Sequence, residues 1–134
     1  MRSSSYKCLL LAGSLLISAC AESAPEQHAL DVRASAYNSV PEQTVGNPAI
    51  AAWGDRLKPG MKAIAVSRDL LEEGLDYNME IQIEGLPGRY RVLDKMHPRW
   101  ERKIDIYMGE DVEAALDWGV RDVTIRWKPV SDEG

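Results

Sequence analysis

The chain has 134 residues, which is enough for one domain of ordinary size and too few for two. Its hydrophobic content of 45% and its charged content of 28% are typical of a globular protein and exclude a wholly disordered chain. The formal net charge is −5, and an acidic protein is poorly suited to binding nucleic acid, so we expect no nucleic-acid partner.

The N-terminal 20 residues have a pattern of their own: basic, then apolar, then small residues and a cysteine. Two cations precede an apolar run at 8–17, which is too short to span a membrane as a stable helix. The following Ile-Ser-Ala-Cys at 17–20 resembles a lipobox, in which Cys20 is lipidated and becomes the new first residue. An ordinary secretory signal cut nearby is the alternative. Residue 21 is Ala rather than Asp, so by resemblance to Gram-negative lipoproteins we expect an outer-membrane anchor facing the periplasm.

Cleavage before Cys20 would leave a domain without a free thiol. Cys8 departs with the signal peptide, 1–19, and Cys20 carries the lipid, so we expect neither a disulfide nor thiol chemistry. The mature chain would keep 14 basic and 21 acidic side chains, a net charge of −7. Residues 20–31 are polar and lack periodicity, which predicts a tether before a domain over 32–128 and a tail at 129–134.

Alternating apolar residues predict six short strands within that domain. The predicted strands span 32–38, 61–66, 79–84, 88–93, 102–108 and 120–127. A Gly-Leu-Pro-Gly loop at 85–88 joins the third and fourth strands as a hairpin. The sequence has no phenylalanine, so the aromatic core must come from Trp and Tyr, and Trp118 and Trp127 fall at core positions.

One short helix is predicted over 110–118, with Glu110 and Asp111 where the helix dipole favours negative charge. Its expected apolar face is formed by Val112, Ala115, Leu116 and Gly119. A single helical turn is expected at 69–74, ending at glycine. Strands this short gain from closure, because closure leaves no exposed edge, so the fold class is mainly β and the architecture a small closed barrel.

Two carboxylates bracket a short basic loop in the middle of the domain. Asp94 ends one apolar run, and Asp105 lies inside a strand in which Ile104 and Ile106 point to the other face. Aspartate is disfavoured within strands, so its presence there requires a reason. We therefore hypothesise that Asp94 and Asp105 share a site; the alternative is that both are solvated surface acids.

Five segments of the domain are notable for their order and spacing: Ala36-Tyr37, Ile64-Ala65-Val66, Leu93-Asp94, Ile104-Asp105-Ile106-Tyr107 and Ala115-Leu116-Asp117-Trp118-Gly119. As an ordered set they resemble the three-aspartate (3D) domain. This domain also occurs in the membrane-bound lytic transglycosylase A family and in stationary-phase survival muralytic enzymes. The resemblance covers roughly 32–127. It implies a six-stranded double-psi β-barrel that cleaves peptidoglycan glycan strands and leaves 1,6-anhydro ends.

The resemblance assigns roles to individual residues. The second family aspartate, taken as the catalytic acid, falls on Asp94, and the third falls on Asp105. The position of the first is Ser67, with Asp69 two residues later. Lys95-Met96 stand where the family usually has Thr-Gly after the catalytic aspartate. These departures bear on turnover more than on fold, and they keep a non-catalytic peptidoglycan-binding module as the alternative.

Lytic cleavage requires one carboxyl that acts twice, first as an acid and then as a base. Ordinary glycosidases use two carboxylates, but here the 6-hydroxyl of the sugar is the nucleophile. Free aspartate has a pKa of about 3.9, so the acid must be shifted upward by burial or by a like charge, which Asp105 can supply to Asp94. Nearby cations would oppose this shift if they point inward. These cations are Lys95, His97, Arg99, Arg102 and Lys103.

Other residues of this region are candidates for substrate binding. Arg99 and Arg102 can bind lactyl or peptide carboxylates bidentately, although a solvated charge run is an equal alternative. Tyr37, Trp53 and Trp100 can stack on sugar faces. We expect no cofactor and no metal, because no recognised ligand spacing is present, even around His97 and the two acids.

The expected partners are peptidoglycan glycan strands and, through the lipid, a membrane; protein partners remain unassigned. A third possibility is an assembly lipoprotein whose groove holds a protein segment.

Overall fold

The computed structural model describes residues 26–40 and 49–129. The predicted signal peptide, the lipidation site at Cys20 and residues 130–134 of the predicted tail lie outside the described residues. The described elements are β1 (His28–Tyr37), β2 (Ala63–Val66), α1 (Arg68–Glu72), β3 (Glu80–Ile83), β4 (Tyr90–Lys95), β5 (Lys103–Tyr107), α2 (Val112–Trp118) and β6 (Arg121–Trp127). None of the helices in this part of the chain has the length and hydropathy needed to cross a membrane.

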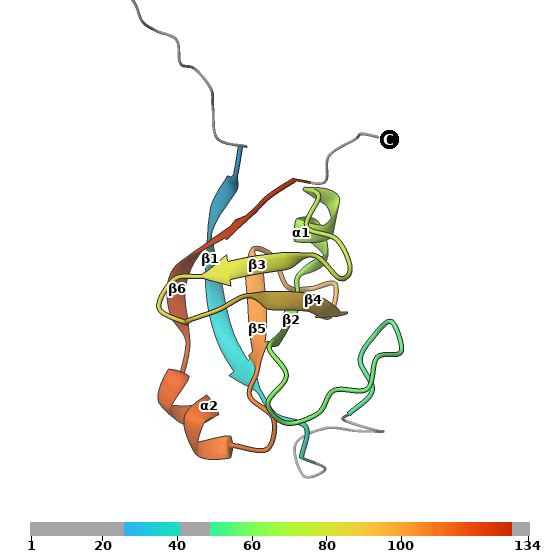
Figure 1. Cartoon of the computed structure of the whole chain (residues 1–134), viewed down its shortest axis with the longest axis vertical. Coiled ribbons are helices and arrows are strands. Elements are labelled where there is room, and N and C mark those ends of the chain that lie inside the picture. The colour runs from blue at the N-terminus through green and yellow to red at the C-terminus, as the bar shows by residue number, and fades with distance from the viewer. Residues whose placement is uncertain (1–25, 41–48, 130–134) are drawn as a thin grey trace, which may run out of the picture.

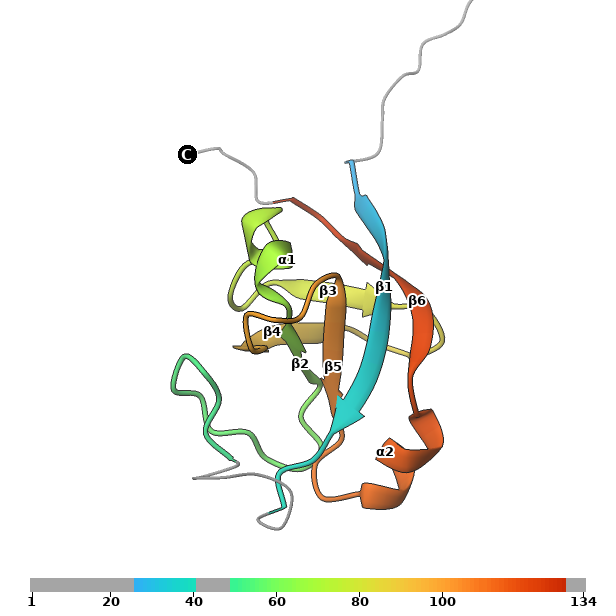
Figure 2. The ribbon, with the colours of Figure 1, turned by 180° about the vertical axis from the view of Figure 1, so that it is seen from behind.

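The six strands close into a barrel in the order β1-β5-β2-β4-β3-β6, which confirms the predicted fold class (Figure 1). β1 pairs with β5 in parallel, β2 pairs with β4 in parallel, and the remaining neighbours are antiparallel. If β1, β2 and β3 exchange labels with β4, β5 and β6, respectively, the cyclic order of the strands stays the same. The two parallel pairs, β1 with β5 and β2 with β4, then change places. The barrel therefore has the internal two-fold relation of a double-psi arrangement. In the view from the opposite side, β1 and β5 lie nearest to the viewer (Figure 2).

Two strands have bounds that differ from the prediction in a way that matters. β1 begins at His28 rather than Val32, because His28–Ala34 pair antiparallel with β6, so part of the expected tether is strand. β4 continues to Lys95, so Asp94 lies within the strand rather than just after it. The start of β1 and the end of β4 are both set by pairing with a neighbouring strand of the barrel. The local sequence cannot show that pairing.

The interior of the barrel is filled mainly by branched aliphatic side chains. Ile64, Ile104 and Ile125 are fully buried there, and Trp118 and Trp127 join them as predicted. A second apolar group, which we call the loop cluster, forms where the segment 49–62 packs on the outer face of β2, β4 and β5. It consists of Ala51, Leu57, Ala63, Leu93 and Tyr107. This outer layer shields the strand faces that also carry Asp94 and Asp105.

The helix α2 differs from the prediction in the face that it buries. Asp111 caps its N-terminus by accepting a hydrogen bond from the Ala114 amide at 3.0 Å. Trp118 is its buried residue, and its Nε1–H donates to the Ala34 carbonyl of β1 at 3.1 Å. Leu116, predicted to be on the apolar face, is 74% exposed, because at about 100° per residue it lies far around the helix from Trp118.

Candidate functional site

A β-bulge in β4 decides where Asp94 points. Strict alternation from Tyr90 and Val92, which face the barrel interior, would also turn Asp94 inward. Instead, the register with β2 shifts at Leu93: Ile64 pairs with Val92, but Ala65 pairs with Asp94. The extra residue turns both Leu93 and Asp94 to the outer face. Re-aiming a side chain in this way is a common use of bulges near functional sites.

The two acids flank one small residue. Ala65 of β2 pairs with Asp94 on one side and with Asp105 on the other, and Asp105 pairs in turn with Ser35 of β1. Residues paired across neighbouring strands project to the same face of a sheet. Two strand spacings separate the acids, which places their Cα atoms about 10 Å apart. The methyl group of Ala65 leaves the space between them open.

A hollow of about 280 Å³ lies over this row of residues. It is lined by Tyr37, Ala65, Asp94, Lys95, Met96, His97, Trp100 and Asp105. Its size is near the lower end for small-molecule sites. We call it the acid hollow. Four of the predicted site residues, two acids and two aromatics, therefore line a common concavity.

The carboxylate of Asp94 is half-buried and hydrogen-bonded. Its Oδ1 accepts from the Ala52 amide at 2.7 Å and from the Lys95 amide at 3.0 Å, and its Oδ2 accepts from the Tyr37 hydroxyl at 3.4 Å. Burial raises the pKa of Asp94, and these three donors oppose that rise. None of the nearby cations is among the causes that lower it. The ammonium of Lys95 instead lies over the Trp53 ring, 5.0 Å from its centroid.

Asp105 and Tyr37 complete the polar part of the acid hollow. Burial raises the pKa of Asp105 and the charge of Asp94 adds to the rise, while the Ser35 hydroxyl at 3.0 Å and the Lys103 ammonium lower it. Burial also raises the pKa of Tyr37 far above its usual value, with the charges of both acids adding to the rise. The Tyr37 phenol therefore stays neutral and acts as a hydrogen-bond donor to Asp94.

Two side chains anchor the end of the basic loop at the start of β5. The Asp69 carboxylate accepts from the Arg102 amide at 3.0 Å and 3.2 Å, and Arg102 has a left-handed φ of 53°. The buried Ser67 hydroxyl accepts from the Lys103 amide at 3.0 Å. At the position where the sequence resemblance expects an aspartate, Ser67 is thus a neutral, fully buried group, and the nearby carboxylate of Asp69 holds the backbone of the loop.

Of the two tryptophans predicted to bind substrate, one lines the acid hollow and the other does not. Trp100 lines the acid hollow, with the Lys103 ammonium 4.0 Å and the Arg99 guanidinium 4.9 Å from its ring centroid. A sugar that stacks on this indole competes with these cations for the ring. Trp53 does not line the hollow; it packs against Tyr77, with ring centroids 4.9 Å apart, and its ring contacts the Lys95 ammonium.

Arg102 lies apart from the acid hollow. Its Nε donates to the Asp31 carbonyl at 3.1 Å, and its side chain lines a separate concavity together with Arg33, Glu101 and Asp122. The structure therefore does not bring Arg102 together with Asp94 and Asp105. The left-handed backbone at Arg102, which turns the chain into β5, sends its side chain toward β1.

Sequence reasoning missed three residues of the site. Ser35 hydrogen-bonds Asp105, Ala52 donates its amide to Asp94, and Ala65 keeps the space between the acids open. Two of them contribute a backbone group or a small side chain, which leave no chemical signal in a sequence. Ser35 alternates with Ala34 and Ala36 in β1, and that pattern indicates only that its side chain faces outward.

Residues 26–40 and 49–129 contain no group of three or more His, Cys, Asp or Glu side chains that could hold a metal ion. No protein-family model matches the chain. No curated protein matches its sequence either. The described structure defines the chain as a mainly β protein built on a closed six-stranded barrel, with two neighbouring acids on its outer face.

Proposed function

We propose that this protein is a 3D-domain lipoprotein of the cell envelope that cleaves peptidoglycan glycan strands as a lytic transglycosylase. The observation that carries the proposal is the placement of Asp94 and Asp105 on either side of Ala65 in one hollow, with the pKa of Asp94 raised by burial. Perturbed acids in a concavity are a recognised mark of catalytic sites. Anchoring through Cys20 at the outer membrane is part of this proposal.

In the proposed reaction, Asp94 carries the proton. The protonated carboxyl gives its proton to the glycosidic oxygen as the bond from that oxygen to the anomeric carbon breaks. The 6-hydroxyl of the same sugar attacks the anomeric carbon, and the Asp94 carboxylate takes up the hydroxyl proton. No water is consumed, and the product is a 1,6-anhydro sugar. Tyr37 and the Ala52 amide orient the carboxylate, and Asp105 adds negative charge where the developing positive charge of the sugar ring can be stabilised.

The second candidate is a non-catalytic peptidoglycan-binding module. The specific observation in its favour is Ser67, which is buried, neutral and committed to the Lys103 amide at the position of the first family aspartate. A further carboxylate is therefore absent from that point of the site. Binding without turnover needs only the acid hollow with its aromatic wall, Tyr37 and Trp100, and the neighbouring cation Arg99.

Incubation with purified sacculi separates these functions. If the protein is a lytic transglycosylase, it releases anhydro-muropeptides, and Asp94→Asn abolishes the release while Asp122→Asn, an exposed acid on β6, does not. Co-sedimentation with sacculi without release would support the binding module instead. Absence of both binding and release would contradict both candidates.

A further inference from the structure

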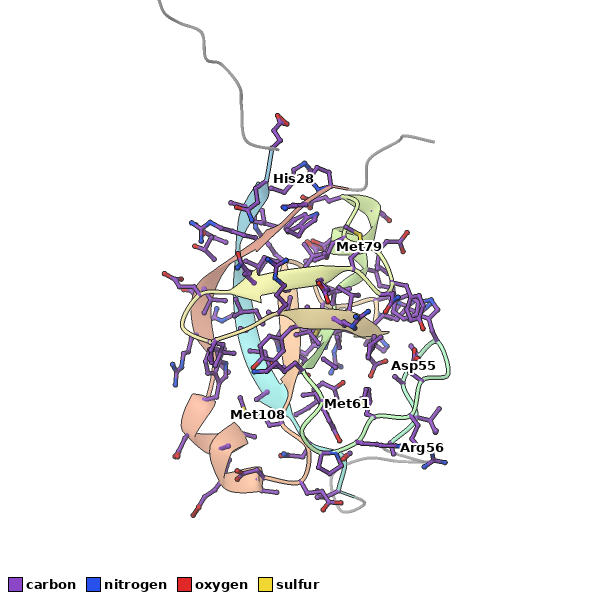
Figure 3. All side chains as sticks on the ribbon, viewed as in Figure 1. His28, Asp55, Arg56, Met61, Met79 and Met108 are labelled. Carbon is purple, nitrogen blue, oxygen red and sulfur yellow. The ribbon has the colours of Figure 1, made fainter. Side chains whose placement is uncertain are left out.

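A hollow of about 470 Å³, larger than the acid hollow, lies over β3, β4 and the end of β6. It shares no lining residue with the acid hollow. Its charged lining consists of Arg89, Arg91, Arg126, Lys128 and Glu80. Four cations face one acid, although the whole chain has a net charge of −5. We call this concavity the basic hollow. Figure 3 shows Met79, one of its lining residues, at the upper end of the barrel, away from Met61 of the segment that covers the loop cluster.

Most of these cations have no partner within the described part of the chain. Arg91 is paired with Glu80 at 3.3 Å and donates to the Asn78 side chain at 3.0 Å. The side chains of Arg89, Arg126 and Lys128 make no hydrogen bond or ion pair with any residue among 26–40 and 49–129. Because the single lining acid is already paired, the basic hollow has an excess of donors over acceptors.

We propose that the basic hollow binds a short peptide that carries two or more carboxylates. Guanidinium groups bind carboxylates bidentately, and Arg89 and Arg126 come from different segments, so they suit several separated carboxylates better than one compact anion. The partly exposed side chain of Met79 provides an apolar surface for the aliphatic parts of a peptide. The site does not require turnover at Asp94; identifying the peptide as a peptidoglycan stem rests on the proposed function.

Calorimetric titration with the sugar-free stem peptide L-Ala-γ-D-Glu-meso-diaminopimelate tests this proposal. The peptide should bind, its fully amidated form should bind at least tenfold more weakly, and affinity should fall as salt concentration rises. Arg89→Gln and Arg126→Gln should each weaken binding about tenfold, which corresponds to about 1.4 kcal/mol. Arg33→Gln removes the same charge from an exposed position outside the hollow and should leave affinity unchanged.

Several outcomes would overturn the proposal. Absence of binding, equal binding of the amidated peptide, or an equal effect of Arg33→Gln would each refute a carboxylate site in this hollow. If inorganic phosphate binds as tightly as the peptide, the hollow does not select a peptide over a compact anion, and the proposal is refuted. Unfolding curves in urea show whether each variant is folded. Because the probe has no glycosidic bond, its failure to bind would leave the sacculus assay, and hence the proposed function, untouched.

Discussion

Replacing Asp94 or Asp105 by Asn should stabilise the protein at neutral pH. Burial raises the pKa of both acids above that of the unfolded chain, about 3.9. The stability that such a group contributes is present below the unfolded pKa and is lost as the pH rises through the folded pKa. An asparagine does not ionise, so it avoids this loss. At position 94 its Oδ1 can still accept from the Ala52 and Lys95 amides, which are both bonded to Oδ1 of the aspartate.

The spacing of the strands gives the magnitude of the mutual repulsion. With Ala65 between them, the two acids lie about 9.6 Å apart at their Cα atoms. For carboxylates separated by about the same distance as the Cα atoms, Coulomb's law at an effective dielectric constant of about 20–80 gives about 0.4–1.7 kcal/mol, toward the lower value where water enters the hollow. Each single variant removes this repulsion, and the double variant removes it only once. The gain of the double variant should therefore fall short of the sum of the single gains by that amount.

Urea unfolding at two pH values measures this effect. The Asn variants should be more stable than the parent protein at pH 7, and the difference should shrink below a pH of about 3.9, where free aspartate is protonated. Asp122→Asn changes an exposed acid and should alter stability by less than about 0.5 kcal/mol. Variants that are less stable than the parent by equal amounts at both pH values would refute the reasoning, because the hydrogen bonds would then outweigh the cost of ionisation.

Two further predictions concern the segments that hold the acid hollow in place. Ser67→Ala removes the acceptor of the Lys103 amide and should destabilise the protein by about 1–3 kcal/mol in urea unfolding; a loss below about 0.5 kcal/mol would contradict that role. Gly109→Ala and Gly74→Ala both place a side chain at positive φ, but only at position 109 would the new Cβ lie 3.0 Å from the Pro59 Cα. Gly109→Ala should therefore lower the free energy of unfolding by about 1–3 kcal/mol more than Gly74→Ala does. Equal urea midpoints for the two variants would show that Pro59 moves aside.

The sequence predicted the elements well where periodicity reports burial directly. The strand predicted at 120–127 shows this: Val123, Ile125 and Trp127 alternate with more exposed residues, and they face the barrel interior. Prediction failed where the outcome depends on a distant partner. Leu116 is apolar yet exposed, because the short helix packs on β1 through Trp118 and cannot bury both residues.

The candidate site, too, could be predicted only in part from the sequence. The structure places Asp94 and Asp105 in one hollow, but only one of the two expected causes raises the pKa of Asp94. We expected burial or the charge of Asp105 to raise it; burial is the main cause, and Asp105 is not among the causes. The residue between the acids, Ala65, comes from a third strand, so their distance could not be read from the loop that joins them.

The proton affinity of Asp94 therefore depends on the segment 49–62 more than on the second acid. Part of this segment covers the outer face of β4 and forms the loop cluster, which shields the acid from water and raises its pKa. The same segment supplies the Ala52 amide, the first of the three donors that lower that pKa. One piece of chain thus provides opposing effects on one carboxyl. A shift of this segment would change shielding and hydrogen bonding together, and with them the pKa of Asp94.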